Sequence, residues 1–128
     1  MATATLSQPS AGTRAITIDA IFCAISGSSL VLFNGALSDA TGIPALALLV
    51  IGLVTLASSA FMAFMLRLPE MMGFLLRAAL AVNVVWVIAS VMILLSGVWT
   101  LTGTGVALII GIALIVEAIS IGQWRALK

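Results

Sequence analysis

Four long apolar runs, separated by short polar turns, dominate the chain. They cover about residues 16–37, 44–66, 71–96 and 102–123 of the 128-residue sequence. Each run has the roughly 20 residues that an α-helix needs to cross a hydrocarbon core about 30 Å thick. None shows the alternation of polar and apolar positions over about 10 residues that marks a transmembrane β-strand. The pattern therefore predicts an all-α fold, a bundle of four transmembrane helices.

The segments between these runs support the same division. Residues 1–13, MATATLSQPSAGT, are small and polar, so we expect a disordered tail before a single membrane domain over residues 14–128. The stretch SDATGIP is rich in turn formers, and Pro44 suits the first turn of the second helix. In RLPE, Pro69 disfavours a helical conformation at Leu68, which separates the second run from the third. The stretch GVWTLTG forms the last turn.

The basic residues predict the orientation. The chain has five basic residues: Arg14, Arg67, Arg77, Arg125 and Lys128. All five fall on one side of the four-helix arrangement, and the two loops on the opposite side contain none. Lys and Arg are enriched on the cytoplasmic side of membrane proteins. We therefore expect a multi-pass protein of the bacterial inner (plasma) membrane, with both termini in the cytoplasm.

Composition excludes several classes of function. The chain is 63% hydrophobic and 7% charged with a mean hydropathy of +1.36, whereas soluble domains are about 25% charged. The net charge of +1 and the lack of a basic run argue against nucleic-acid binding. There is no histidine, and Cys23 is the single cysteine, so the commonest metal and haem ligand and the commonest general base are missing. We expect no enzyme activity, no metal site and no cofactor.

Polar side chains inside the runs define a candidate site. Asp19, Asn83 and Glu117 lie in the cytoplasmic halves of three different runs, and Arg77 lies just inside the third. An isolated carboxylate near the centre of a span costs about 2.5–3.5 kcal/mol on insertion scales, and clustering reduces that cost. The sequence therefore predicts an intramembrane polar cluster of these four residues that faces the bundle interior. A structural ion pair, a protonated acid and a proton relay all fit the carboxylates. The partner of Arg77 is left open between Asp19, Glu117 and the membrane interface.

Other residues are expected to serve packing and anchoring. Two rows of small residues at four-residue spacing are typical of close helix contacts in lipid: Ala20, Ala24 and Ser28 in the first run, and Gly103, Ala107 and Gly111 in the fourth. Trp99 and Trp124 are expected to be interface anchors at opposite faces of the membrane.

Short motifs relate the chain to known membrane proteins. Arg14 and Asp19 form R-x-x-x-x-D before Gly27, the third run contains N-x-x-W, the fourth opens with Thr-Gly, and the chain closes with GQWRALK. In these features residues 14–128 resemble a group of small bacterial four-helix membrane proteins to which no function is assigned, so the resemblance implies the fold alone. The chain is also similar in length, helix number and first-helix carboxylate to small multidrug resistance transporters. It departs from them by having no tyrosine, no aromatic-lined site pattern and a second carboxylate at Glu117.

Two functional hypotheses follow from the sequence. The first is a non-catalytic accessory, stabilising or interaction subunit, either a homo-oligomer or part of a larger membrane complex in contact with lipid. The alternative is a small homodimeric proton-coupled transporter that uses Asp19 or Glu117. A bundle that binds lipid or quinone is a third and weaker interpretation.

Overall fold

A computed structural model describes residues 10–127, and every regular element in this part of the chain is helical. The elements are α2 (Ala11–Leu32), α3 (Asn34–Thr41), α4 (Ala45–Met65), the 3₁₀ turn η1 (Pro69–Met71), α5 (Met72–Ser96) and α6 (Gly103–Leu127). Four helical segments are long and apolar enough to cross a membrane: α2, α4, η1 with α5, and α6. The prediction of an all-α chain with four long apolar helices is confirmed, and this is the build of a multi-pass membrane protein.

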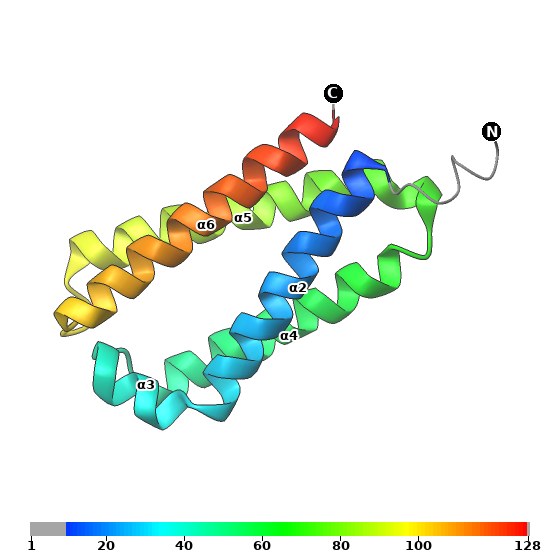
Figure 1. Cartoon of the computed structure of the whole chain (residues 1–128). Helices are drawn as coiled ribbons and strands as arrows, with labels where there is room; N and C mark the ends of the chain where they lie inside the picture. Colours follow the sequence, from blue (N-terminus) through cyan, green and yellow to red (C-terminus); the bar gives the residue numbers. More distant parts are fainter. Residues whose placement is uncertain (1–9, 128) are drawn as a thin grey trace.

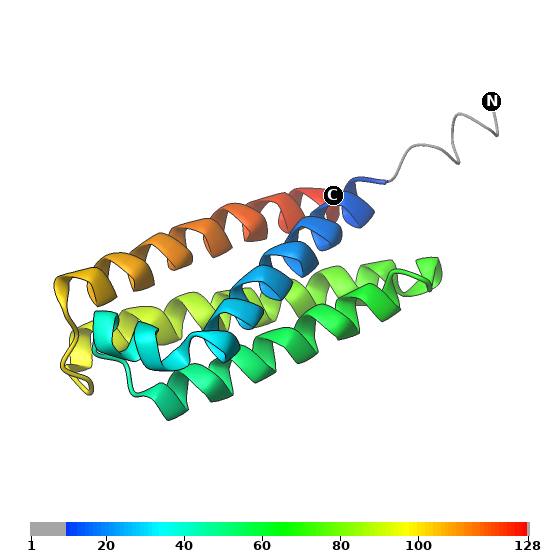
Figure 2. The same ribbon diagram turned by 60° about the horizontal axis from the view of Figure 1, so that its bottom comes forward.

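The long helices are arranged as two pairs. In Figure 1, α5 and α6 run side by side, and α2 crosses over α4. Figure 2 shows the same four helices running along one common direction. The beginning of α2, η1 and the end of α6 lie together, and we call this end of the bundle the arginine end because it carries Arg14, Arg67, Arg77 and Arg125. The opposite end holds α3 and the α5–α6 connection. Lys128 lies outside the described residues.

The first helix begins earlier than the sequence predicts. The Ser10 side chain caps it by accepting a hydrogen bond from the Thr13 backbone N–H at 3.0 Å. A serine in this position satisfies one of the backbone donors that the first turn leaves without a partner. Residues 11–13 are therefore helical, and the remaining part of the expected polar tail, residues 1–9, lies outside the described residues.

The first helix also ends earlier than predicted. The apolar run suggests a span to residue 37, but α2 stops at Leu32, and Phe33 separates it from α3. Asn34 accounts for the break, because its side-chain Nδ2 donates to the Val31 carbonyl at 2.8 Å and replaces a backbone partner. The short helix α3 then folds back across the end of the bundle and stops at Gly42, whose φ of +83° favours glycine.

Helices α2 and α4 approach each other through two glycines. A Cβ atom placed on Gly27 would lie 2.9 Å from the backbone oxygen of Gly52, so only a glycine permits this separation. Ser59 of α4 adds a hydrogen bond at 2.8 Å to the carbonyl oxygen of Ala20. Close backbone contact and an interhelical hydrogen bond are the main sources of helix association in lipid.

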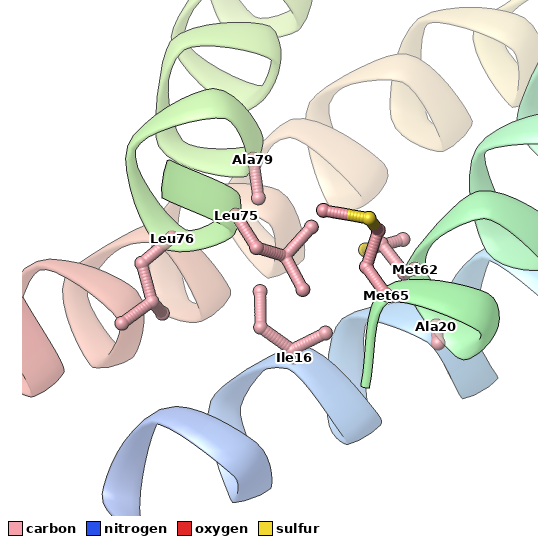
Figure 3. Close-up of a cluster of buried hydrophobic side chains, with 7 residues drawn as sticks. All are labelled: Ile16, Ala20, Met62, Met65, Leu75, Leu76 and Ala79. Atoms are coloured by element: carbon pink, nitrogen blue, oxygen red, sulfur yellow. The ribbon is translucent and has the colours of Figure 1, made fainter. Parts of the chain in front are cut away.

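A small hydrophobic cluster joins the two helix pairs at the arginine end. Figure 3 shows side chains from α2, α4 and α5 converging there: Ile16, Ala20, Met62, Met65, Leu75, Leu76 and Ala79. Most other large apolar side chains of the described chain face outward, as lipid-facing positions do. The cluster therefore fixes the relative position of the helices beside the candidate site.

The opposite end is held by hydrogen bonds. Thr102 donates through its backbone N–H to the carbonyl oxygen of Thr41 at 3.0 Å and through Oγ1 to that of Ala40 at 2.6 Å. Its Oγ1 also accepts from the Gly105 N–H at 3.0 Å and so caps α6. One threonine therefore both starts α6 and ties it to the end of α3.

Candidate functional site

Three polar side chains from three helices meet inside the bundle near the arginine end. Asp19 of α2 is 3% exposed, Gln123 of α6 is fully buried, and Asn83 of α5 is half-buried. Gln123 Nε2 donates to Asp19 Oδ2 at 2.6 Å, and Asn83 Nδ2 donates to the same oxygen at 3.1 Å and to Gln123 Oε1 at 3.0 Å. These three residues form a closed hydrogen-bonded triangle, which we call the Asp19 triad.

The thiol of Cys23 completes the surroundings of Asp19. It lies one helical turn further along α2 and donates to Asp19 Oδ1 at 3.4 Å. The described residues that donate to the Asp19 carboxyl are thus two amides and one thiol, and none of them is a cation. Charge-assisted hydrogen bonds from neutral donors stabilise a carboxylate without neutralising it. The site is a buried acid held in place by neutral partners.

The structure brings together only part of the cluster that the sequence predicts. Asp19 and Asn83 meet, and Asn83 bridges two side chains, but Arg77 and Glu117 are exposed and lie outside the triad. The reason is the direction of each helix face. Leu75, Leu76 and Ala79 are the buried side of that part of α5, so Arg77 points away. The interior position assigned to Arg77 and Glu117 is therefore corrected.

Gln123 is the member of the triad that the sequence analysis missed. On α6 the buried residues are Gly105, Val116 and Gln123, and steps of 11 and 7 residues at about 100° each put all three on one side. Glu117 directly follows Val116, so it is rotated by about 100° from the buried face. The sequence gives only a weak signal for Gln123, because it stands at the predicted end of a span and within the closing GQWRALK motif, where a polar side chain is expected.

A large cavity lies between the two helix pairs, next to the triad. Its volume is about 640 Å³, and residues of all four long helices line it. Asp19, Cys23 and Asn83 stand at the polar part of the lining, and Trp86 follows Asn83 one turn further along α5. The rest is mainly apolar, with a few hydroxyl groups from α2 and α4: Ser26, Ser29, Thr55 and Ser58. The cavity therefore has one polar region, and the rest of its lining is mainly apolar.

Glu117 borders a second, smaller cavity on the outer side of α5 and α6. This groove has a volume of about 270 Å³ and shares no lining residue with the large cavity. Its other lining residues are Leu80, Val84, Val87, Ile88, Ser120, Ile121 and Trp124. The two carboxylates that the sequence places in the same half of the bundle therefore belong to different surfaces.

The remaining candidate residues occupy varied positions. Ala20 is buried against α4, and Ala24 and Ser28 are half-buried on α2. Gly103 and Ala107 are exposed, and a Cβ atom on Gly103 or Gly111 would meet no described atom within 4 Å, so this row does not pack within the described chain. Trp99 lies in the α5–α6 connection and Trp124 near the end of α6, at opposite ends of the bundle.

Metal ligands and known relatives add no further assignment. Among residues 10–127, no group of three or more His, Cys, Asp or Glu side chains is placed to hold a metal ion. Comparison with protein-family models, with curated proteins and with solved structures found no match to this chain.

Proposed function

We propose that the protein is a non-catalytic interaction subunit of a bacterial inner-membrane complex, and that the outer face of α5 and α6 binds a transmembrane helix of another subunit. The observation that supports this proposal most directly is the exposed position of Glu117 on a membrane-spanning helix.

The depth of Glu117 makes its exposure costly in lipid. It follows Gly103 by fourteen residues and precedes Leu127 by ten, so it stands close to the middle of α6. At 1.5 Å per residue it is about 15 Å from the nearer end of the helix, beyond the reach of a short side chain. Ionisable residues inside membranes almost always face a protein interior or a water-filled cavity. A partner that covers this face satisfies the requirement.

The surroundings of Glu117 favour a different subunit over a second copy of this chain. A two-fold symmetric contact centred on the groove sets the same patch against itself, so that Glu117 faces Glu117 of the second copy. Two carboxylates at that distance repel each other unless they share a proton. A helix that carries a lysine, arginine or amide donor satisfies the carboxylate directly, and the apolar groove beside it accepts the remaining side chains.

Site-specific photocrosslinking in the native membrane tests this proposal. We expect a photoreactive residue at Ile121, in the groove, to capture another membrane protein, and one at Val50, on the outer side of α4, to capture none. The two positions are matched in exposure, at 47% and 51%. Glu117→Leu should abolish the adduct at Ile121. An adduct with a second copy alone, or equal adducts at both positions, would show that the proposal is wrong.

The large cavity beside Asp19 favours a second candidate function, the small homodimeric transporter. Asp19 would be the group that binds a proton or a cationic substrate, and Glu117 would have no direct part because it borders a different surface. Transport into proteoliposomes should then be lost in Asp19→Asn and retained in Glu117→Gln. Loss in both variants, or in neither, would contradict this assignment.

A further inference from the structure

We propose that the large cavity between the helix pairs binds a single-chain amphiphile with a protonated amine head group, with the amine at Asp19 and Asn83 and the hydrocarbon chain along the apolar lining. This inference does not depend on the partner proposed for the α5–α6 groove. It uses the Asp19 cavity of the second candidate function and names a ligand class for it, and binding without transport would end that candidate while leaving the inference standing.

The size of the cavity selects a small molecule. Its volume of about 640 Å³ falls in the range of about 300–1,000 Å³ that is usual for ligand sites. The cavity therefore has the size of a small-molecule site, and it is large enough for one hydrocarbon chain.

The cavity is accessible from the membrane. Several of its lining residues are also exposed on the outer surface of α2, α4 and α5: Ile25, Val54, Phe61 and Val82. These side chains are all large and apolar, so the opening faces the lipid-exposed surface of the bundle. A molecule dissolved in the bilayer can therefore enter sideways with its chain in an apolar environment throughout.

The polar region of the cavity lacks a cation and offers hydrogen-bond acceptors. The described donors to Asp19 are neutral, and Oδ1 receives only the long thiol contact at 3.4 Å. Asn83 uses Nδ2 for both of its hydrogen bonds, and among the described residues none donates to its Oδ1. A buried carboxylate in a membrane is stabilised by an opposite charge. An ammonium group supplies that charge, and its N–H groups can donate to Asp19 Oδ1 and to Asn83 Oδ1. The hydrogen bonds of the Asp19 triad hold these two residues in place.

Fluorescence quenching measures occupancy of this cavity directly. Trp86 lines it, so a variant in which Trp99 and Trp124 are replaced by phenylalanine reports on Trp86 alone. The probe is dodecylamine with a bromine atom in its chain, added to the protein in phosphatidylcholine nanodiscs. We expect saturable quenching, with a half-saturation concentration at least tenfold lower than for the equally brominated dodecanol.

Two variants test the two halves of the proposed site. Asp19→Asn should remove the preference for the amine over the alcohol. Ala78→Phe fills the cavity without altering the triad and should abolish saturable quenching by both probes, whereas Ala81→Phe, at an exposed position outside the cavity, should not. Equal half-saturation concentrations for the amine and the alcohol in the parent protein would show that the site does not recognise the charge of the head group. Saturable quenching retained in Ala78→Phe would show that the cavity is not the site.

Discussion

Gln123 is the residue on which the buried acid depends most. It is fully buried and makes the shortest hydrogen bond to Asp19, at 2.6 Å, while its own Oε1 accepts from Asn83. Because both of its side-chain polar atoms are used, an apolar replacement breaks two sides of the triad at once. Asp19 then keeps Asn83 and the distant thiol of Cys23 as partners.

We predict that Gln123→Leu lowers the free energy of unfolding by about 1–2 kcal/mol, since a buried acceptor loses a donor that nothing replaces. Reversible unfolding of the purified chain by SDS in mixed micelles measures the change. Ala118→Leu, which adds the same side chain at an exposed position of the same helix, is the control, and it should shift stability by less than about 0.5 kcal/mol. Equal losses in the two variants would mean that the triad adds nothing to stability.

The same residues show how far the sequence can predict the site. Asp19 and Asn83 stand out because a polar side chain within an apolar run must find a partner. Helical periodicity relates residues along one helix but does not say which side faces inward. In α6, the side that faces inward carries Gln123, and Glu117 lies on another side. Which side faces inward depends on contacts with α2 and α5, and a local sequence pattern does not contain them. Arg77 was misplaced for the same reason.

At the scale of elements, the α2–α4 pair depends on the absence of side chains at Gly27 and Gly52. We predict that Gly27→Ala destabilises the chain by about 1–3 kcal/mol, because the new methyl group meets the backbone of α4 and forces the helices apart. Gly111→Ala on α6 is the control. Nothing described lies within 4 Å of its new Cβ, so it should gain up to about 1 kcal/mol from helix propensity. SDS unfolding measures both, and a Gly27→Ala chain as stable as the parent would contradict the close approach.

The contact between α3 and α6 depends on Thr102. We predict that Thr102→Val loses about 1–2 kcal/mol, because it removes the cap of α6 and the hydrogen bond to Ala40 together. Hydrogen exchange should accelerate at residues 40–43 and 103–106 and stay unchanged near the Asp19 triad. Thr104→Val, an equal change of shape two residues away and exposed, should leave exchange unaltered. Faster exchange throughout the chain in Thr102→Val would point to global rather than local loosening.

The limits of prediction differ between elements. Runs of about 20 apolar residues and the prolines at positions 44 and 69 are strong local signals, and they indicate the long helices well. The break at Phe33 has a weaker signal. Asn34 and Gly35 interrupt an apolar run without ending it. The Asn34 side chain breaks the helix locally, but the direction that α3 then takes is held by hydrogen bonds between its end and Thr102 at the start of α6. Such a partnership between distant segments is not visible in a local pattern.

For the molecule as a whole, charge and fold lead to one expected orientation. Four arginines lie at the end of the bundle that also holds the beginning of α2 and the end of α6, while α3 at the other end carries Asp39 and no basic residue. A one-sided distribution of basic residues fixes the direction of insertion. It also disfavours a population inserted both ways, which an antiparallel homodimer would require.

We predict that Asp39 faces the periplasm and Glu70 the cytoplasm. Both are exposed at opposite ends of the bundle, so each can carry a cysteine in a Cys23→Ser background with little effect on packing. In intact cells a membrane-impermeant maleimide should label Asp39→Cys and leave Glu70→Cys unlabelled until the cells are opened. Partial labelling at both positions would indicate dual insertion. The arginines would then not determine topology, and an antiparallel dimer would become possible.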